Sequence, residues 1–250
     1  MFDKNVLIYG NFFEEEGKVM GRVVKDPELR RNEIMSVAQA LFYKNGYKNT
    51  SVNMIIEALG ISKGAFYHYF KSKEDLLDQL AENFTKEILA SMQAIMNDKD
   101  LNAIQKLNQV YLKGSIYKAE RFDFILTLIN AIYNDDNLFL RYKFNQKSLD
   151  YSLPMMTEIL KQGKKEGVFR IENPEITARH ILLFGTSIAS HNAELLQKLK
   201  EVPQKIHEVM QNFREYQKSV ERILGAPENS IKAFDKAFLE TLEKHYREKL

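Results

Sequence analysis

Residues 62–70, SKGAFYHYF, combine hydrogen-bond donors with small side chains in a pattern that could read DNA. Lys63 can donate to the O6 and N7 atoms of guanine, and Ala65 can contact the methyl group of thymine. His68 can donate to a base or to a phosphate. A short helix that carries such residues at its exposed start can enter a major groove.

The elements that would position these residues form a helix-turn-helix. A helix is predicted over residues 51–58, followed by the tight turn LGIS and a second helix from residue 63. Gly60 gives the turn its freedom, and Ser62 is placed to cap the second helix. Three apolar residues can pack the two helices together: Ile55, Ile61 and Phe66.

The run over residues 50–76 closely resembles the DNA-binding signature of the tetracycline-repressor (TetR) family of bacterial regulators. The family positions that contact base edges or adjacent phosphates correspond here to Lys63, Gly64, Ala65 and His68. Those that hold the phosphate backbone correspond to Tyr67, Tyr69 and Lys73. The family often has threonine where this chain has Ala65, so the resemblance does not transfer an operator preference.

Residues at the start of the first motif helix, and at the start of the helix that follows the motif, could also contact phosphate. Thr50 or Ser51 is expected to cap the first motif helix and to present a hydroxyl and a backbone N–H to the DNA backbone. Lys73 would lie at a helix N-terminus, which itself attracts phosphate. Phe66 and Phe70 are expected in the core rather than on the DNA.

Composition limits the function classes that remain. The chain has 250 residues and no cysteine, which excludes a disulfide framework and a thiolate metal site. The five histidines lack metal-ligand spacing, and no nucleotide-binding or metalloprotease motif is present. We therefore expect no catalytic residue, no metal and no cofactor.

The distribution of charge favours DNA as the partner. The net charge is only +2, but residues 21–75 hold nine Lys and Arg against six Asp and Glu. Positive charge around the motif is what phosphate contact requires. No apolar run reaches the roughly 20 residues that a membrane helix needs, so we expect no membrane contact and a cytoplasmic, nucleoid-associated protein.

The periodicity predicts an all-α protein of about ten helices. Residues 1–21 are expected to be an extension outside the fold, residues 22–75 a DNA-binding domain of three helices, and residues 76–250 an effector-binding and dimerisation domain. A fourth helix is expected from Ser72 to about residue 96, the next from Asp100, and a long one opened by Asp135 and Asp136. That long helix must accommodate Pro154.

Polar residues inside apolar stretches are the candidates for contacts to a small-molecule effector, because a buried polar group needs a partner. Together with nearby large side chains they suggest a cavity for an apolar or amphipathic ligand. The expected pocket residues are Tyr111, Phe124, Thr127, Asn130, Met155, Phe184, Ser187 and His191.

A heptad-spaced apolar seam over residues 206–223 suggests a helix for self-association. Family resemblance puts the dimer on this helix and the one before it. The expected interface residues are Gly185, Ala189, Ile206, Val209, Phe213, Tyr216 and Val220. The seam could instead pack against the chain's own last helix through Ile231, Phe234 and Phe238.

These patterns together favour a homodimeric transcriptional repressor that a small molecule releases from a palindromic operator in double-stranded DNA. The alternative in another class is a helix-turn-helix protein that organises the nucleoid or accompanies division without an effector. An operator next to the chain's own gene, and affinity that falls with a small molecule, would favour the repressor.

Overall fold

The computed structural model describes residues 26–133, 138–199, 201–233 and 244, and the structural statements below refer to these residues. Their regular elements are all helices, α1 to α10, as the periodicity predicts. No helix in this part of the chain is both long enough and apolar enough to span a bilayer. The predicted extension over residues 1–21 and the helix-opening pair Asp135 and Asp136 lie outside the described residues.

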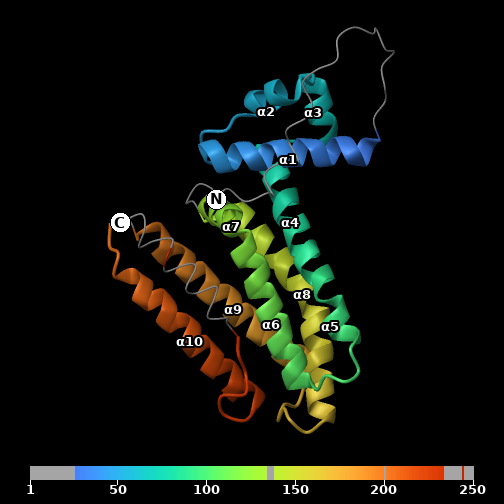
Figure 1. Ribbon diagram of the computed structural model, residues 1–250, viewed down its shortest axis with the longest axis vertical. Helices are drawn as coiled ribbons and strands as arrows, with labels where there is room; N and C mark the ends of the chain where they lie inside the picture. Colours follow the sequence, from blue (N-terminus) through green and yellow to red (C-terminus); the bar gives the residue numbers. More distant parts are fainter. Residues whose placement is uncertain (1–25, 134–137, 200, 234–243, 245–250) are drawn as a thin grey trace, which may run out of the picture.

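The first three helices form the unit at the top of Figure 1: α1 (Pro27–Asn45), α2 (Val52–Leu59) and α3 (Lys63–Tyr69). Asp26 starts α1 by accepting a hydrogen bond from the Glu28 amide at 2.8 Å. Gly60 ends α2 in the left-handed conformation (φ 59°), which a residue with a side chain adopts only with strain. The glycine is one of the local signals that predicted the motif.

The middle of the chain runs through α4 (Lys73–Ser91), α5 (Gln93–Asn97), α6 (Ala103–Glu120) and α7 (Phe122–Ile132). The predicted single helix to residue 96 is wrong, because the chain turns at Met92 and starts α5. The predicted start at Asp100 is also early. Asn102 caps α6 instead, in a capping box with Gln105, which satisfies two amides at once.

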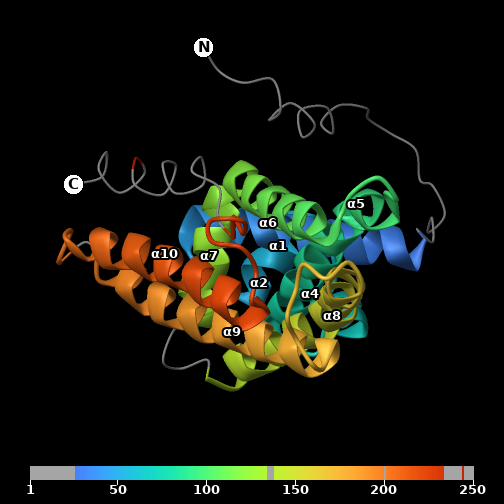
Figure 2. The same ribbon diagram turned by 90° about the horizontal axis from the view of Figure 1, so that it is seen from below.

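The last described helices are α8 (Leu138–Lys165), α9 (Pro174–Gln197) and α10 (Lys205–Leu224). Pro154 lies inside α8, as expected, without ending it. Helices α9 and α10 lie side by side in both views, and α10 ends beside the start of α9 (Figures 1 and 2). There the Arg170 amide donates to the Leu224 carbonyl at 2.7 Å.

One apolar core joins the N-terminal unit to the rest of the molecule. It contains Ile34 and Phe42 of α1, Leu77 of α4 and Ile132 of α7. The expected domain boundary between residues 75 and 76 is therefore crossed by continuous packing. A second core lies among α6, α8, α9 and α10, and Ile231 completes it.

Candidate DNA-binding interface

Helix α3 divides its residues cleanly between the core and the surface. Phe66 and Phe70, one turn apart, are both fully buried. Lys63 and His68 are exposed, and the Tyr67 side chain is 46% exposed. Because residues four apart share a helical face, the exposed residues form one outward strip. This strip is free to meet a DNA groove.

Gly64 lies on the same strip, and none of the residues that the structure describes requires its small size. A Cβ atom built there would meet only the Ser62 hydroxyl, at 3.9 Å. Ala65 is half-buried, and its amide donates to the same hydroxyl at 3.1 Å. The missing side chain at Gly64 therefore leaves open space outside the protein.

Thr50 differs from the expectation. The residue is fully buried, and its hydroxyl hydrogen bonds to the carbonyls of Gly46 at 2.9 Å and Leu41 at 3.2 Å. It therefore fastens the end of α1 and offers no hydroxyl to phosphate. Ser51 is the residue that caps α2, and its exposed hydroxyl accepts from the Met54 amide at 3.2 Å.

Lys73 also has a role inside the chain. Its ammonium donates to the carbonyls of Tyr47 and Thr50, both at 2.9 Å, and lies 4.3 Å from the centre of the Tyr47 ring. Burial lowers the pKa of Lys73, and the nearby Glu74 carboxylate opposes that shift. Two of its three ammonium donors are thus used to hold the loop between α1 and α2.

Tyr47 is the residue of this region that the sequence did not single out. Its ring packs edge-on against Phe42 at 5.1 Å, and its hydroxyl donates to Glu74 at 3.4 Å. Burial and the neighbouring carboxylate of Glu74 raise the pKa of Tyr47. An aromatic residue after Gly46 gives no local sign that a lysine 26 residues later will bind its carbonyl.

Tyr69 lies half-buried at the end of α3. Its ring meets that of His68 edge-on at 4.9 Å and packs against the core under the motif. This placement supports the outward strip while leaving part of the ring exposed.

A cluster of charges ties α4 to α8 beneath the motif. Lys147 of α8 donates to Asp78 at 2.9 Å and to Glu82 at 2.8 Å on α4. The Tyr151 hydroxyl adds a hydrogen bond to Glu82 at 2.6 Å. Hydrogen bonds from Lys147, Lys86 and Tyr151 lower the pKa of Glu82 to about 2. The helix that leads to the motif is thus held by paired charges.

The residues expected to line an effector pocket do not gather in one place. Tyr111, Met155 and Phe184 pack against the core of α6, α8 and α9, whereas Phe124 packs against the core shared with α1. Thr127 is half-buried. Three are exposed on outward helical faces, because only one side of α7 and α9 is buried: Asn130, Ser187 and His191. Among the expected pocket residues, Tyr111 has a buried hydroxyl, and burial together with the neighbouring Tyr216 hydroxyl raises its pKa.

The residues expected at a dimer interface are largely used within the chain. Val209, Tyr216 and Val220 are buried, and Gly185 approaches Tyr216 so closely that a Cβ would lie 2.8 Å from its hydroxyl oxygen. The close helix contact at Gly185 is therefore between α9 and α10 of one chain. Ile206 and Phe213 are half-buried, and Ala189 is exposed.

The apolar seam of α10 was alternatively expected to pack against a later segment of the same chain, and one residue of that segment does so. Ile231 is fully buried in the same core as Val220, and its amide donates to the buried Glu221 carboxylate at 3.0 Å. Phe234 and Phe238 lie outside the described residues.

The chain is similar in sequence to known bacterial regulatory proteins. Residues 34–80 match the family described as bacterial regulatory proteins, tetR family. The chain is 29% identical over 155 residues to the HTH-type transcriptional repressor KstR2 of Mycobacterium tuberculosis, covering 60% of this chain and 74% of the relative. It is 28% identical over 164 residues to the fatty acid metabolism regulator protein of Bacillus subtilis, covering 65% and 82%.

A crystal structure of a tetR-family regulator from Syntrophomonas wolfei superposes with a TM-score of 0.56 at 21% identity, covering 78% of this chain and 96% of that one. The all-helical fold and the outward strip of α3 define a helix-turn-helix transcriptional regulator. Residues 34–80 match the tetR family, and the chain is similar to transcriptional regulators of that family beyond this match. Relatives that are named HTH-type transcriptional repressors favour the repressor hypothesis over a nucleoid-organising protein.

Proposed function

We propose that this protein represses transcription by binding a palindromic DNA operator as a homodimer, and that a small ligand releases it. The observation that carries the proposal is the strip of Lys63, Gly64, Tyr67 and His68 on α3, which the fold exposes and does not use. Lys63 and His68 would contact base edges, while Tyr67 and Ser51 would hold phosphates. Names of relatives as repressors support the direction of regulation.

A dimer is needed because one short helix reads only one half-site. Two recognition helices must stand one turn of DNA apart, about 34–36 Å, to occupy successive major grooves. Exposed apolar residues on α9 and α10 offer the surface for self-association, namely Ile176, Leu183 and Ile223. We place the dimer contact on these residues, together with the exposed Ala189 and the half-buried Ile206 and Phe213.

Release by a ligand requires a path from the helical body to α3. Two contacts supply one: the charged cluster between α4 and α8, and the apolar core shared by α1 and α7. A ligand that displaces α7 or α8 would change the spacing of the recognition helices. A tenfold release needs about 1.4 kcal/mol of preference for the DNA-incompetent spacing.

Operator mapping followed by two substitutions tests the DNA role. Genomic footprinting should find a palindrome, and Lys63→Ala should weaken binding to it by about 1–3 kcal/mol and relax sequence preference. Lys99→Ala removes the same charge from an exposed residue between α5 and α6, at the far end of the molecule, and should leave binding unchanged (Figure 1). Equal loss in both variants would mean that only net charge matters.

A titration of ligand with and without operator tests release. Operator DNA must lower ligand affinity by the factor by which ligand lowers operator affinity. Equal ligand affinity in the two titrations would rule out ligand-controlled release.

A further inference from the structure

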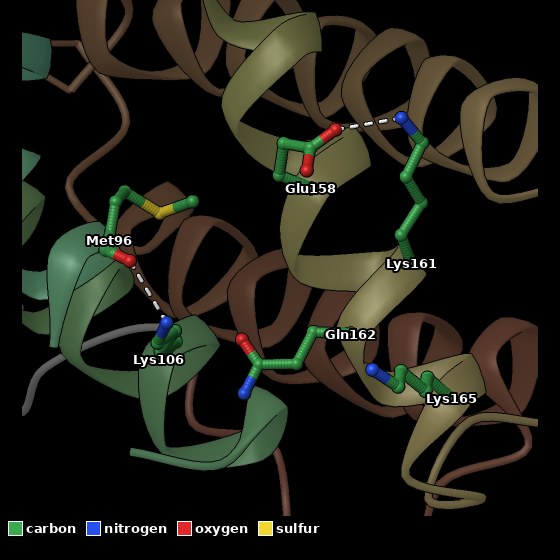
Figure 3. Close-up of a pocket in the computed structure, with 6 residues that line it drawn as sticks. All are labelled: Met96, Lys106, Glu158, Lys161, Gln162 and Lys165. Carbon is green, nitrogen blue, oxygen red and sulfur yellow. Dashed lines mark hydrogen bonds and ion pairs between the residues drawn. The ribbon is translucent and has the colours of Figure 1, made fainter. Parts of the chain in front are cut away.

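A hollow of about 350 Å³ lies where α5, α6 and α8 meet, at the end of the molecule far from α3. Figure 3 shows its lining, which is rich in cations. The lining residues are Met96, Lys106, Glu158, Lys161, Gln162 and Lys165. Three lysines against one glutamate make the wall of the hollow positive.

Lys106 is the most informative of these side chains. The residue is only 7% exposed, and its ammonium donates to the Met96 carbonyl at 2.9 Å. No carboxylate within the part of the chain that the structure describes pairs with it. A buried ammonium has three donors and is unfavourable without an opposite charge or further acceptors. An anion in the hollow would supply both.

The charged groups around the hollow leave one net positive charge, because Lys106 and Lys165 stand against the single carboxylate of Glu166 once the Lys161–Glu158 pair has cancelled. Lys161 is bonded to Glu158 at 2.7 Å, so that pair is neutral. Glu166 accepts hydrogen bonds from the Ala103 amide and from Gln162. Lys165 is exposed and has no ion-pair partner among the described residues. The first turn of α6, which carries Lys106, adds the positive end of its helix dipole.

Apolar side chains continue from the hollow into the body of the molecule. Met96 lines the hollow and also packs against the second core, together with Met155 and Tyr111. The hydroxyl of Tyr111 lies beside that of Tyr216, and the Thr157 hydroxyl is buried without a partner among the described residues. Methionine side chains adapt readily to an inserted chain.

We infer that this hollow binds the oxyanion, a carboxylate or a phosphate, of an amphipathic small molecule whose apolar part enters between α6 and α8 past Met96. Lys106 and Lys165 bind the charged end, and Met155 and Tyr111 contact the apolar part. The inference rests on the proposed function for its biological meaning, because it gives the effector a chemical class. Lysine is well suited to this task as a compact charge with several donors.

Calorimetric titration of the full chain with decanoate, decanol and inorganic phosphate tests the inference. Decanoate should bind at least about tenfold more tightly than decanol, as a charge-assisted hydrogen bond implies. Lys106→Met should abolish that preference, and Lys165→Met should reduce it. Lys113→Met is the matched control, because it removes an exposed lysine from the same helix and should preserve the preference.

Several results would overturn the inference. They are equal affinity for decanoate and decanol, an undiminished preference in both Lys106→Met and Lys165→Met, and phosphate alone binding as tightly as decanoate, which would indicate a site for a free anion. Lys165→Met changes an exposed residue, so it keeps the test valid if Lys106→Met fails to fold. Lysine-dependent decanoate binding that leaves operator affinity unchanged would count against ligand release and leave the anion site standing.

Discussion

Helix α3 and the pair of α9 and α10 show opposite relations between sequence pattern and surface. In α3 the residues buried by the fold and those left to a partner are different residues, with Phe66 inside and Lys63 outside. In α9 and α10, most of the apolar residues expected to contact a partner chain are buried in the chain's own core, as Val220 is. The comparison teaches that an outward residue identifies a partner surface better than an apolar repeat does.

The largest expected effect is on the stability of the fold, and it tests whether the apolar seam of α10 belongs to the core. Val220→Asp places an unpaired charge in a fully buried site and should destabilise the protein by more than about 4 kcal/mol. Leu183→Glu, on the exposed face of α9, should stay folded and give monomers with weak operator binding. Circular dichroism melts and sedimentation measure both. A Val220→Asp protein that folds but is monomeric would show that the apolar seam of α10 lies in the dimer interface.

The next effect concerns the charged cluster between α4 and α8. The lowered pKa of Glu82 means that its stabilising contribution is complete above the ordinary glutamate value of 4.5 and is lost as the pH falls toward about 2. Glu82→Gln should therefore destabilise the protein by about 1–3 kcal/mol at neutral pH and flatten the loss of stability in acid.

Urea unfolding at several pH values would measure this dependence. Glu201→Gln changes an exposed carboxylate and serves as the control. The same pH dependence in wild type and Glu82→Gln would show that the cluster does not stabilise the fold.

A smaller effect distinguishes the two roles of Lys73. Lys73→Met should destabilise the protein by about 1–2 kcal/mol, because the carbonyls of Tyr47 and Thr50 lose a charged donor. Lys71→Met removes an exposed charge from the turn just before α4 and should change stability by less than about 0.5 kcal/mol. Thermal melts compare the two variants. Identical melting temperatures would mean that Lys73 acts only on DNA.

The smallest effect on stability is expected for a substitution in α3, where it separates a role in DNA binding from a role in folding. Gly64→Ala should leave the protein as stable as before, or more stable by up to about 1 kcal/mol, because alanine favours a helix and the site is open. Operator affinity should nevertheless fall, since a methyl group now stands where DNA approaches. Parallel melts and binding titrations decide the matter, and unchanged operator affinity would remove Gly64 from the interface.

Local signals in the sequence determined the helix-turn-helix and its outward strip. The caps at Ser51 and Ser62, the left-handed Gly60 and the spacing of Phe66 and Phe70 each act within one or two turns of chain, so the sequence alone contains their physics. The same local rules act at the start of α9, where Asn173 caps the helix and Pro174 opens it. The start of α6 was misplaced because Asn102 with Gln105 makes a stronger cap than Asp100.

Only the tertiary structure decided which side chains are free. Thr50 and Lys73 have the chemistry of phosphate ligands, but carbonyls brought close by folding occupy the hydroxyl of one and most of the ammonium of the other. Ser187 and His191 lie in an apolar stretch yet face outward, because α9 buries one side only. Lys106 carries the opposite lesson, since nothing in its neighbourhood of sequence marks a buried charge. Burial and partnership depend on segments distant along the chain, and a local pattern does not encode those distances.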